Sequence, residues 1–402
     1  VLGSIIVPQI RGYHASILSE SLFLSLLVIF LALAVRFMHH PAWRVMVLVA
    51  ITVGAAATVR RTGFAFVPVM LLMVLMQRRD FSGSAKASTS AKATVDKSAD
   101  SGAQRFRPVV PLFFITAVAP LAVLVATEQV LAPIIHDGAA SSLLGRHMFA
   151  KAALIEAAPE LSDPAIFKAE DPVRRALDDQ LEHAFAPIRA MLAAAPPNVR
   201  GVLTIYYETC LQGGCADQAR AATREANEAR QTEVMGAAGL ARIRRAPLSF
   251  LQLTGRHYAS LWTYDRLRHP QTAADLNAFL ATHRPLPYEE LAMSLGPDRT
   301  LEFSGSQSVR YAQYALSAIA IVTGVLALAG CLTAIVSFKL PPAFGAACVA
   351  AMTVHAGLIL TALLAAGFTR FLLGLWPALV AALGLAAWGV LLLRGDVRPP
   401  LP

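Results

Sequence analysis

Charged residues are scarce in this chain of 402 residues. Asp, Glu, Lys and Arg make up 15% of it, whereas an average soluble domain contains about 25%. Hydrophobic residues reach 56%, and they are gathered in long runs instead of being spread evenly. This composition excludes an ordinary water-soluble domain and indicates an integral membrane protein.

Common catalytic motifs are missing as well. The sequence contains no Walker loop, no dinucleotide-binding GxGxxG, no HExxH and no GxSxG, so nucleotide hydrolysis and the usual zinc and serine hydrolase sites lack support. Only 4 cysteines occur. Cys210 and Cys215 form either a small disulfide loop or two separate thiols, and a metal site there lacks two further nearby ligands. Cys331 and Cys348 lie in apolar runs and are predicted to fill the core.

The apolar runs predict an all-α, polytopic bundle of transmembrane helices. A run of about 20 residues crosses the hydrocarbon core, because a helix rises 1.5 Å per residue through roughly 30 Å. The runs are 18–37, 42–59, 62–77, 110–133, 311–337, 343–366 and 370–393. The third is short and contains Pro68.

The basic residues predict the orientation of these helices. The net charge is +9, which also suits a nucleic-acid-binding protein, but the basic residues lie mostly at the ends of apolar runs. We interpret them as topology signals and expect no nucleic-acid partner. Segment 78–107 is rich in Lys, Arg, Ser and Ala, and we expect a disordered cytoplasmic linker there because basic loops stay inside.

This orientation divides the chain into regions. We expect residues 1–77 to form the first transmembrane helices, 108–133 a further one, 134–308 an extracytoplasmic helical domain, and 309–394 three carboxy-terminal transmembrane helices. Residues 395–402 form a cytoplasmic tail. Tyr258, Trp262 and Tyr264 in the outer domain are interpreted as an aromatic belt at the membrane surface.

Three arginines fall on the predicted outer boundary, where the positive-inside rule alone does not put them. These are Arg60, Arg61 and Arg370, and Glu20 lies at the same boundary. Guanidinium groups bind phosphate through forked, charge-assisted hydrogen bonds, so a lipid-linked phosphate is the predicted ligand. The alternatives are snorkelling arginines that only anchor the helices and a Glu20 that only caps its helix.

Short motifs around these residues resemble the GT-C glycosyltransferases. Ser19-Glu20-Ser21-Leu22-Phe23 is similar to their "tE-x-lf" element, and Arg60-Arg61-Thr62-Gly63 with Pro68 to their "R-P-T-G…P" element. Arg370-Phe371-Leu372 with Trp376-Pro377 resembles their "R-Y-l-l-p…P" element. Arg61 stands where the family often has proline, so either Arg60 or Arg61 is the equivalent arginine.

The resemblance implies a multi-pass enzyme of the bacterial cytoplasmic membrane that transfers a sugar from a polyprenyl-phosphate donor on the outer face. Its partners would be this donor, membrane lipid, and a glycan, lipid or protein acceptor. Arg60, Arg61 and Arg370 would bind the donor phosphate, and Glu20 would orient an arginine or the acceptor. No cofactor is predicted, and a divalent metal stays open. The family's catalytic carboxylate lies upstream of Val1, where we expect the complete protein to continue.

Two other functions fit the same residues. An O-antigen ligase or polymerase would use outer arginines in a similar way on diphosphate-linked glycans. A non-enzymatic transporter subunit or membrane anchor is the alternative from another class, although we find no paired half-repeats of the kind that transporters show.

Overall fold

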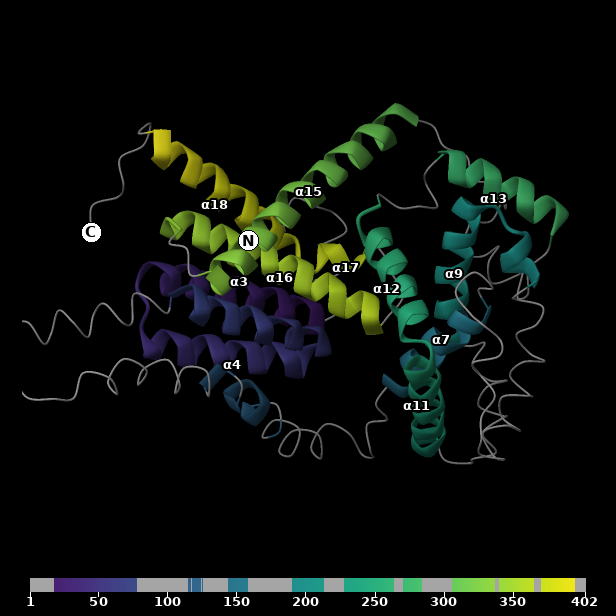
Figure 1. Ribbon diagram of the computed structural model, residues 1–402, viewed down its shortest axis with the longest axis horizontal. Helices are drawn as coiled ribbons and strands as arrows, with labels where there is room; N and C mark the ends of the chain where they lie inside the picture. The colour runs from purple at the N-terminus through teal and green to yellow at the C-terminus, as the bar shows by residue number, and fades with distance from the viewer. Residues whose placement is uncertain are drawn as a thin grey trace, which may run out of the picture. The chain divides into compact units, whose positions relative to one another are not determined.

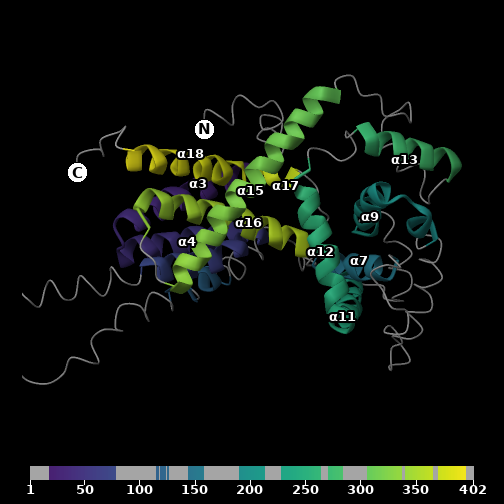
Figure 2. The ribbon, with the colours of Figure 1, turned by 45° about the horizontal axis from the view of Figure 1, so that its top comes forward.

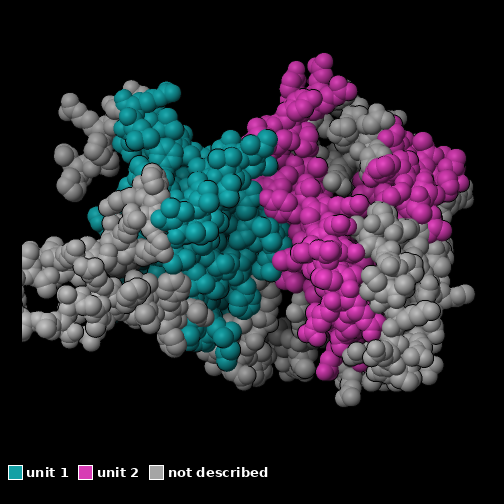
Figure 3. Space-filling view, viewed as in Figure 1, with its two compact units in different colours: residues 1–135, 319–360, 372–402 teal, residues 136–318, 361–371 magenta. Residues whose placement is uncertain are grey.

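The computed structural model describes a helical protein in two compact units (Figures 1 and 3). The described residues are 18–77, 115–116, 118–123, 125, 144–157, 190–212, 228–263, 270–283, 306–336, 340–364 and 370–394. Every regular element within these ranges is a helix, as the sequence predicts. The first unit comprises Val1–Ile135, Ile319–Leu360 and Leu372–Pro402, and the second comprises His136–Ala318 and Thr361–Phe371.

Four helices are long and apolar enough to cross a bilayer. They are α3 (Leu18–His39), α15 (Ser306–Val336), α16 (Pro342–Leu364) and α18 (Trp376–Arg394). Their ranges match the predicted runs, with one correction. The run 370–393 is not one helix, because α17 (Arg370–Leu373) ends in a turn before α18 begins. Pro377 is the second residue of α18 and has no N–H to donate to Leu373, which favours a break at this point.

Two further predicted spans are apolar but shorter. Helix α4 (Trp43–Val59) has 17 residues and a length of about 25 Å, less than the roughly 30 Å of hydrocarbon. The range Thr62–Gln77 is also short and consists of the 3-10 helix η1 (Arg61–Ala65) followed by an α-helix over 66–77. Pro68 lies in the first turn of that helix, where a missing N–H costs little. The run 110–133 and the linker 78–107 lie largely or wholly outside the described residues.

Within the first unit, α15 and α18 each run antiparallel to α16, whereas α3 and α18, which contact each other, both end near the start of α16 (Figures 1 and 2). His355 in α16 lies against Thr323 in α15, and Cys331 lies against Met352, so the two helices run in opposite directions. Helix α18 is antiparallel to α16 in the same way, because Gly357 packs on Leu375 and Gly389 on Phe344.

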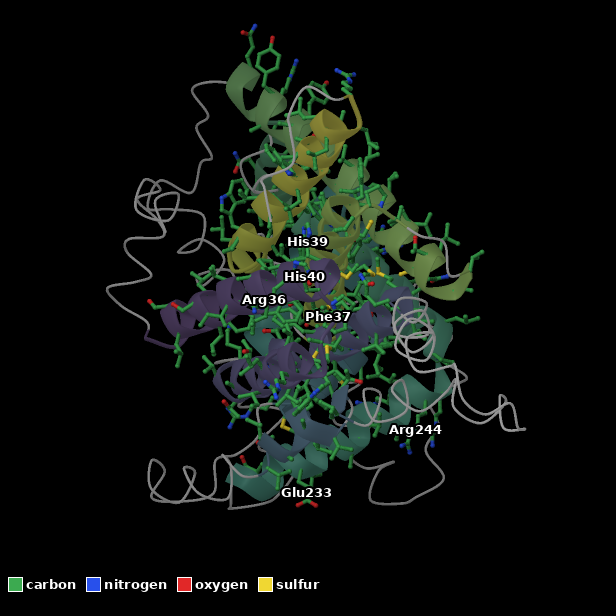
Figure 4. The ribbon with its side chains drawn as sticks, turned by 90° about the vertical axis from the view of Figure 1, so that its left-hand side faces the viewer. Arg36, Phe37, His39, His40, Glu233 and Arg244 are labelled. Atoms are coloured by element: carbon green, nitrogen blue, oxygen red, sulfur yellow. The ribbon has the colours of Figure 1, made fainter. Side chains whose placement is uncertain are left out.

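This polarity gathers basic residues at one end of the first unit, which we call the basic end. It holds the last turn of α3, the start of α4, the start of α16 and the last turn of α18. Its basic residues are Arg36, His39, His40, Arg44 and Arg394. Figure 4 shows Arg36, His39 and His40 close together where α3 ends. The start of α3 and the end of α4 lie at the opposite end of the unit.

Stacked rings join α3 to the helix over 66–77. The ring of Phe66, fully buried, lies 5.3 Å from that of Phe30 and 6.0 Å from that of Phe23, centroid to centroid. Such aromatic pairs add about 0.5–1.5 kcal/mol each beyond the burial of their area. They fix the loop before Phe66 against the start of α3.

The second unit has its own hydrophobic core. Its described helices are α7 (Leu144–Ala157), α9 (Pro197–Gln212), α11 (Glu228–Arg245), α12 (Pro247–Leu261) and α13 (Pro270–Thr282). Phe149, Leu154, Leu203 and Leu253 are among the fully buried side chains. An amphipathic helix is stabilised mainly by burying such an apolar face.

Glycines let α7 and α11 approach backbone to backbone. A Cβ on Gly145 would lie 2.1 Å from the carbonyl oxygen of Thr232, and one on Gly239 would lie 2.7 Å from the backbone nitrogen of Phe149. Gly236 packs directly on Gly145. Only glycine, which has no side chain, permits this close crossing of the two helices. The crossing holds the buried face of α7 against α11.

Candidate functional site

Arg60 occupies the junction between α4 and η1. Its N–H donates to the carbonyl of Ala56 at 2.8 Å and so ends α4, while its own carbonyl accepts from the N–H of Gly63 at 2.8 Å. Its guanidinium carbon lies 5.7 Å from the centre of the Phe23 ring, within the range of a cation–π interaction. Hydrogen bonds thus fix the backbone of Arg60, and the Phe23 ring contacts its guanidinium group.

This contact brings Arg60 close to the first turns of α3, where the backbone of Glu20 lies three residues before Phe23. Arg61 begins η1, and Arg370 begins α17 in the range assigned to the second unit. The side chains of Glu20, Arg61 and Arg370 lie outside the described residues. Two of the predicted elements, the Glu20 helix and the Arg60 turn, are therefore adjacent.

Gly63 makes the turn at Arg60 possible. A Cβ there would lie 2.5 Å from the backbone nitrogen of Ala57 and 2.6 Å from the carbonyl carbon of Ala56. The chain can fold back on the end of α4 only with hydrogen at this position.

Gly63→Ala is therefore expected to lower the free energy of unfolding by about 1–3 kcal/mol, the usual cost of overpacking. Thermal unfolding in detergent measures the effect. Gly384→Ala is the matched control, because a Cβ at Gly384 in α18 meets nothing within 4 Å. Equal melting temperatures for both variants would contradict the close approach at Gly63.

A second group of charged residues lies buried inside the second unit. Lys151 from α7, Glu208 from α9 and His257 from α12 are 0%, 0% and 2% exposed. Lys151 Nζ lies 3.3 Å from both carboxylate oxygens of Glu208, and His257 Nδ1 lies 3.0 Å from Glu208 Oε2. Lys151 Nζ also contacts His257 Nδ1. We call these three residues the Lys–Glu–His cluster.

The cluster brings an amine, a carboxyl group and an imidazole into mutual contact. Burial lowers the pKa of Lys151 below its ordinary 10.5, although the charge and hydrogen bond of Glu208 oppose that shift. Two arrangements satisfy Glu208: a protonated Lys151 beside a neutral imidazole, or a neutral amine beside a protonated His257. Both arrangements are electrically neutral overall, as a buried ionic group requires.

Sequence reasoning missed this cluster because its members are 57 and 49 residues apart along the chain. Each residue alone fits an amphipathic helix. The one local signal is Lys151 itself, which stands within the apolar stretch Met148–Ile155. Charged residues are rarely buried without a partner, but the sequence does not say where the partner is.

The histidine and the cysteines of the apolar runs lie in contacts between helices or in the core. His355 Nε2 lies 3.1 Å from Thr323 Oγ1 of the neighbouring helix α15, so this histidine within an apolar run has a polar partner. Cys348 is buried and Cys331 partly buried, as predicted. Cys215 and the side chain of Cys210 lie outside the described residues.

The predicted aromatic belt needs a correction. Trp262 is only 7% exposed and is buried in the second unit, while Tyr258 is half-buried. Tyr264 lies outside the described residues. A ring that is this deeply buried does not form part of a belt at the membrane surface.

A cavity of about 320 Å³ opens at the basic end. It is lined by Met38, His39, Pro41, Met76, Gln77, Thr333, Leu340 and Pro342. Gln77 Nε2 donates to the carbonyl of Met38 at 3.0 Å and closes its wall. The lining contains no Lys, Arg, Asp or Glu, and the cavity lies at the end opposite Arg60.

In the described ranges, no three His, Cys, Asp or Glu side chains are grouped so that they could hold a metal ion. Comparison with protein-family models, with curated proteins and with solved structures finds no match for this chain. The candidate site therefore rests on the position of Arg60 and on the chemistry of its neighbours.

Proposed function

We propose that this chain is a membrane glycosyltransferase that moves a sugar from a polyprenyl-phosphate donor to an acceptor at the extracytoplasmic surface. The supporting observation is the separation of charge in the first unit. Arg60 lies at one end, and Arg36, His39, His40, Arg44 and Arg394 lie at the other.

The positive-inside rule gives this separation a direction. Because Lys and Arg are retained on the cytoplasmic side, the basic end is the cytoplasmic one and the end of α4 faces outward. The positive-inside rule does not account for Arg60 at the outer end of α4. A bound anion does, because it neutralises the guanidinium group there. The phosphate of a lipid-linked sugar lies at this depth, with its polyprenyl chain among the apolar helices.

Arg60 is suited to bind such a phosphate. The Phe23 ring favours a fixed position for the guanidinium through the cation–π interaction, so less side-chain entropy is lost when it binds. As the bond between sugar and phosphate breaks, negative charge develops on the phosphate oxygens. A positioned guanidinium stabilises that charge more than it stabilises the ground state.

The test uses the complete protein in liposomes with a radiolabelled polyprenyl-phosphate sugar. Arg60→Ala is expected to lower kcat/KM about 100-fold or more, the effect of removing one positioned donor from a developing anion. Arg60→Lys retains charge without the fork and should lose less.

Arg44→Ala is the matched control, because Arg44 also lies 5.7 Å from an aromatic ring centre, that of Trp43, at the basic end. It should leave turnover within about twofold of the wild type, as expected for a surface change remote from the site. Full activity of Arg60→Ala, or equal losses in the two variants, would contradict the phosphate-binding role. A wild-type protein that transfers no sugar would favour the transporter subunit or anchor instead.

A further inference from the structure

Helix α12 has two apolar faces, and only one of them is buried. Leu253, His257 and Leu261 face the core of the second unit. On the other face, Leu248 is 73% and Leu251 is 57% exposed. A leucine normally gains about 1.5–3 kcal/mol from burial, so two such side chains in contact with water on one face make that face a candidate for binding an apolar partner.

Arginines flank these leucines. Residues 234–263 contain four arginines and no Asp or Glu, and three of the arginines, Arg242, Arg244 and Arg245, lie in the last turn of α11. Arg244 is exposed, as is the nearby Leu240 at 41%. Figure 4 shows Arg244 on α11 away from Glu233, the acidic residue near the start of that helix.

We propose that Leu240, Arg244, Arg245, Leu248 and Leu251 form a surface that binds an anionic lipid bilayer. We call it the leucine–arginine surface. Helices with leucines on one side and arginines beside them lie in the membrane interface, with the apolar face at the boundary of headgroups and acyl chains. The guanidinium groups bind lipid phosphates, and the positive charge complements an anionic leaflet.

A bilayer fits this surface better than a protein partner does. Protein interfaces are enriched in aromatic anchors, Met and Arg at their centre, so the arginines suit either partner and the aromatic side chains distinguish the two. The exposed apolar side chains of this surface are leucines, and its arginines lie between Leu240 and Leu248 along the chain, while Trp262 of the neighbouring turn is buried. The chain also carries four helices able to cross a membrane, so lipid is always within reach of the second unit.

The inference is independent of sugar transfer, and the test measures position instead of activity. The full chain is placed in lipid nanodiscs after its four cysteines are replaced by serine or alanine. A single cysteine is introduced by Leu251→Cys, or by Glu233→Cys as the control, and is labelled with a small fluorophore. Lipids with a nitroxide near the headgroup quench a label that lies in the interface, and acrylamide quenches a label that lies in water.

In discs that contain phosphatidylglycerol, the label at position 251 is expected to be quenched by the nitroxide lipid and shielded from acrylamide, with the reverse at position 233. Arg244→Gln and Arg245→Gln should each lower the docking equilibrium constant about fivefold, in line with the attraction of one basic residue to an anionic surface. In discs of phosphatidylcholine alone, the docking equilibrium constant of the unsubstituted surface should likewise be lower than in discs that contain phosphatidylglycerol.

Two outcomes would overturn the inference. A label at 251 that acrylamide reaches freely in phosphatidylglycerol discs would show that this surface faces water. A label that is shielded from acrylamide and yet unaffected by the nitroxide lipid would show that protein, such as a second copy of the chain, covers it.

Discussion

Lys151→Met should lower the free energy of unfolding of the second unit by about 3–5 kcal/mol, which is among the largest effects expected for a single residue in this chain. Methionine fills nearly the same volume but carries no charge, so the carboxylate of Glu208 keeps its burial and loses its cation. Hydrogen exchange of peptides from α7, α9 and α12, followed by mass spectrometry on the full chain in detergent, measures the loss locally.

The double variant Lys151→Met with Glu208→Leu separates charge from packing. Because it removes both ionic partners, most of the stability should return, as it does when buried ion pairs are replaced by apolar side chains. A single variant that is as stable as the wild type would show that Glu208 is not held as a buried carboxylate. A double variant that is less stable than the single one would show that hydrogen bonding in the cluster outweighs desolvation.

The same cluster predicts a direction for the effect of pH. Because burial lowers the pKa of Lys151, the unfolded chain binds more protons than the folded protein between the lowered value and the ordinary 10.5. The free energy of unfolding contributed by this group therefore rises with pH through that window and is constant above it. The double variant should lack this rise, and hydrogen exchange at matched pH values compares the two proteins.

The second large effect is expected at the crossing of α7 and α11. Gly145→Ala puts a methyl group 2.1 Å from the carbonyl oxygen of Thr232. Neither group is the end of a flexible side chain, so the two helices must separate along their contact. We expect a loss of about 3 kcal/mol in the free energy of unfolding, at the upper end for an inserted methyl group, with faster hydrogen exchange in both helices.

Gly255→Ala provides the comparison within the same unit. A Cβ at Gly255 meets nothing within 4 Å, and alanine favours a helix over glycine by about 1 kcal/mol. That variant should therefore be as stable as the wild type or slightly more stable. If Gly145→Ala and Gly255→Ala behaved alike, the backbone contact between α7 and α11 would be refuted.

Helix type and membrane character followed from local properties of the chain. A run such as 343–366 contains no charged residue, and its backbone can satisfy its hydrogen bonds within lipid only as a helix. The break before Trp376 was not predicted, because the run 370–393 is apolar throughout, although Pro377 lacks the N–H that a continuous helix would donate to Leu373. The lengths of α4 and of the helix over 66–77 depended on the turn at Arg60, which apolar periodicity does not reveal.

The candidate arginine site was predictable only in part. The predicted boundary grouped Glu20, Arg60, Arg61 and Arg370, and of these only the side chain of Arg60 is described, in contact with Phe23 of the helix that carries Glu20. The role of Gly63 in shaping the turn was not visible in the sequence, because the contact that demands glycine is with α4.

The sequence by itself determined that the chain is helical and suited to a bilayer, because hydropathy and helix length are properties of consecutive residues. The tertiary structure decided which charges meet. Lys151, Glu208 and His257 come from three helices, and burial makes their mutual contacts obligatory. It likewise decided that Leu248 and Leu251 stay exposed while Leu253 does not, since two apolar faces of one helix differ only in what packs against them.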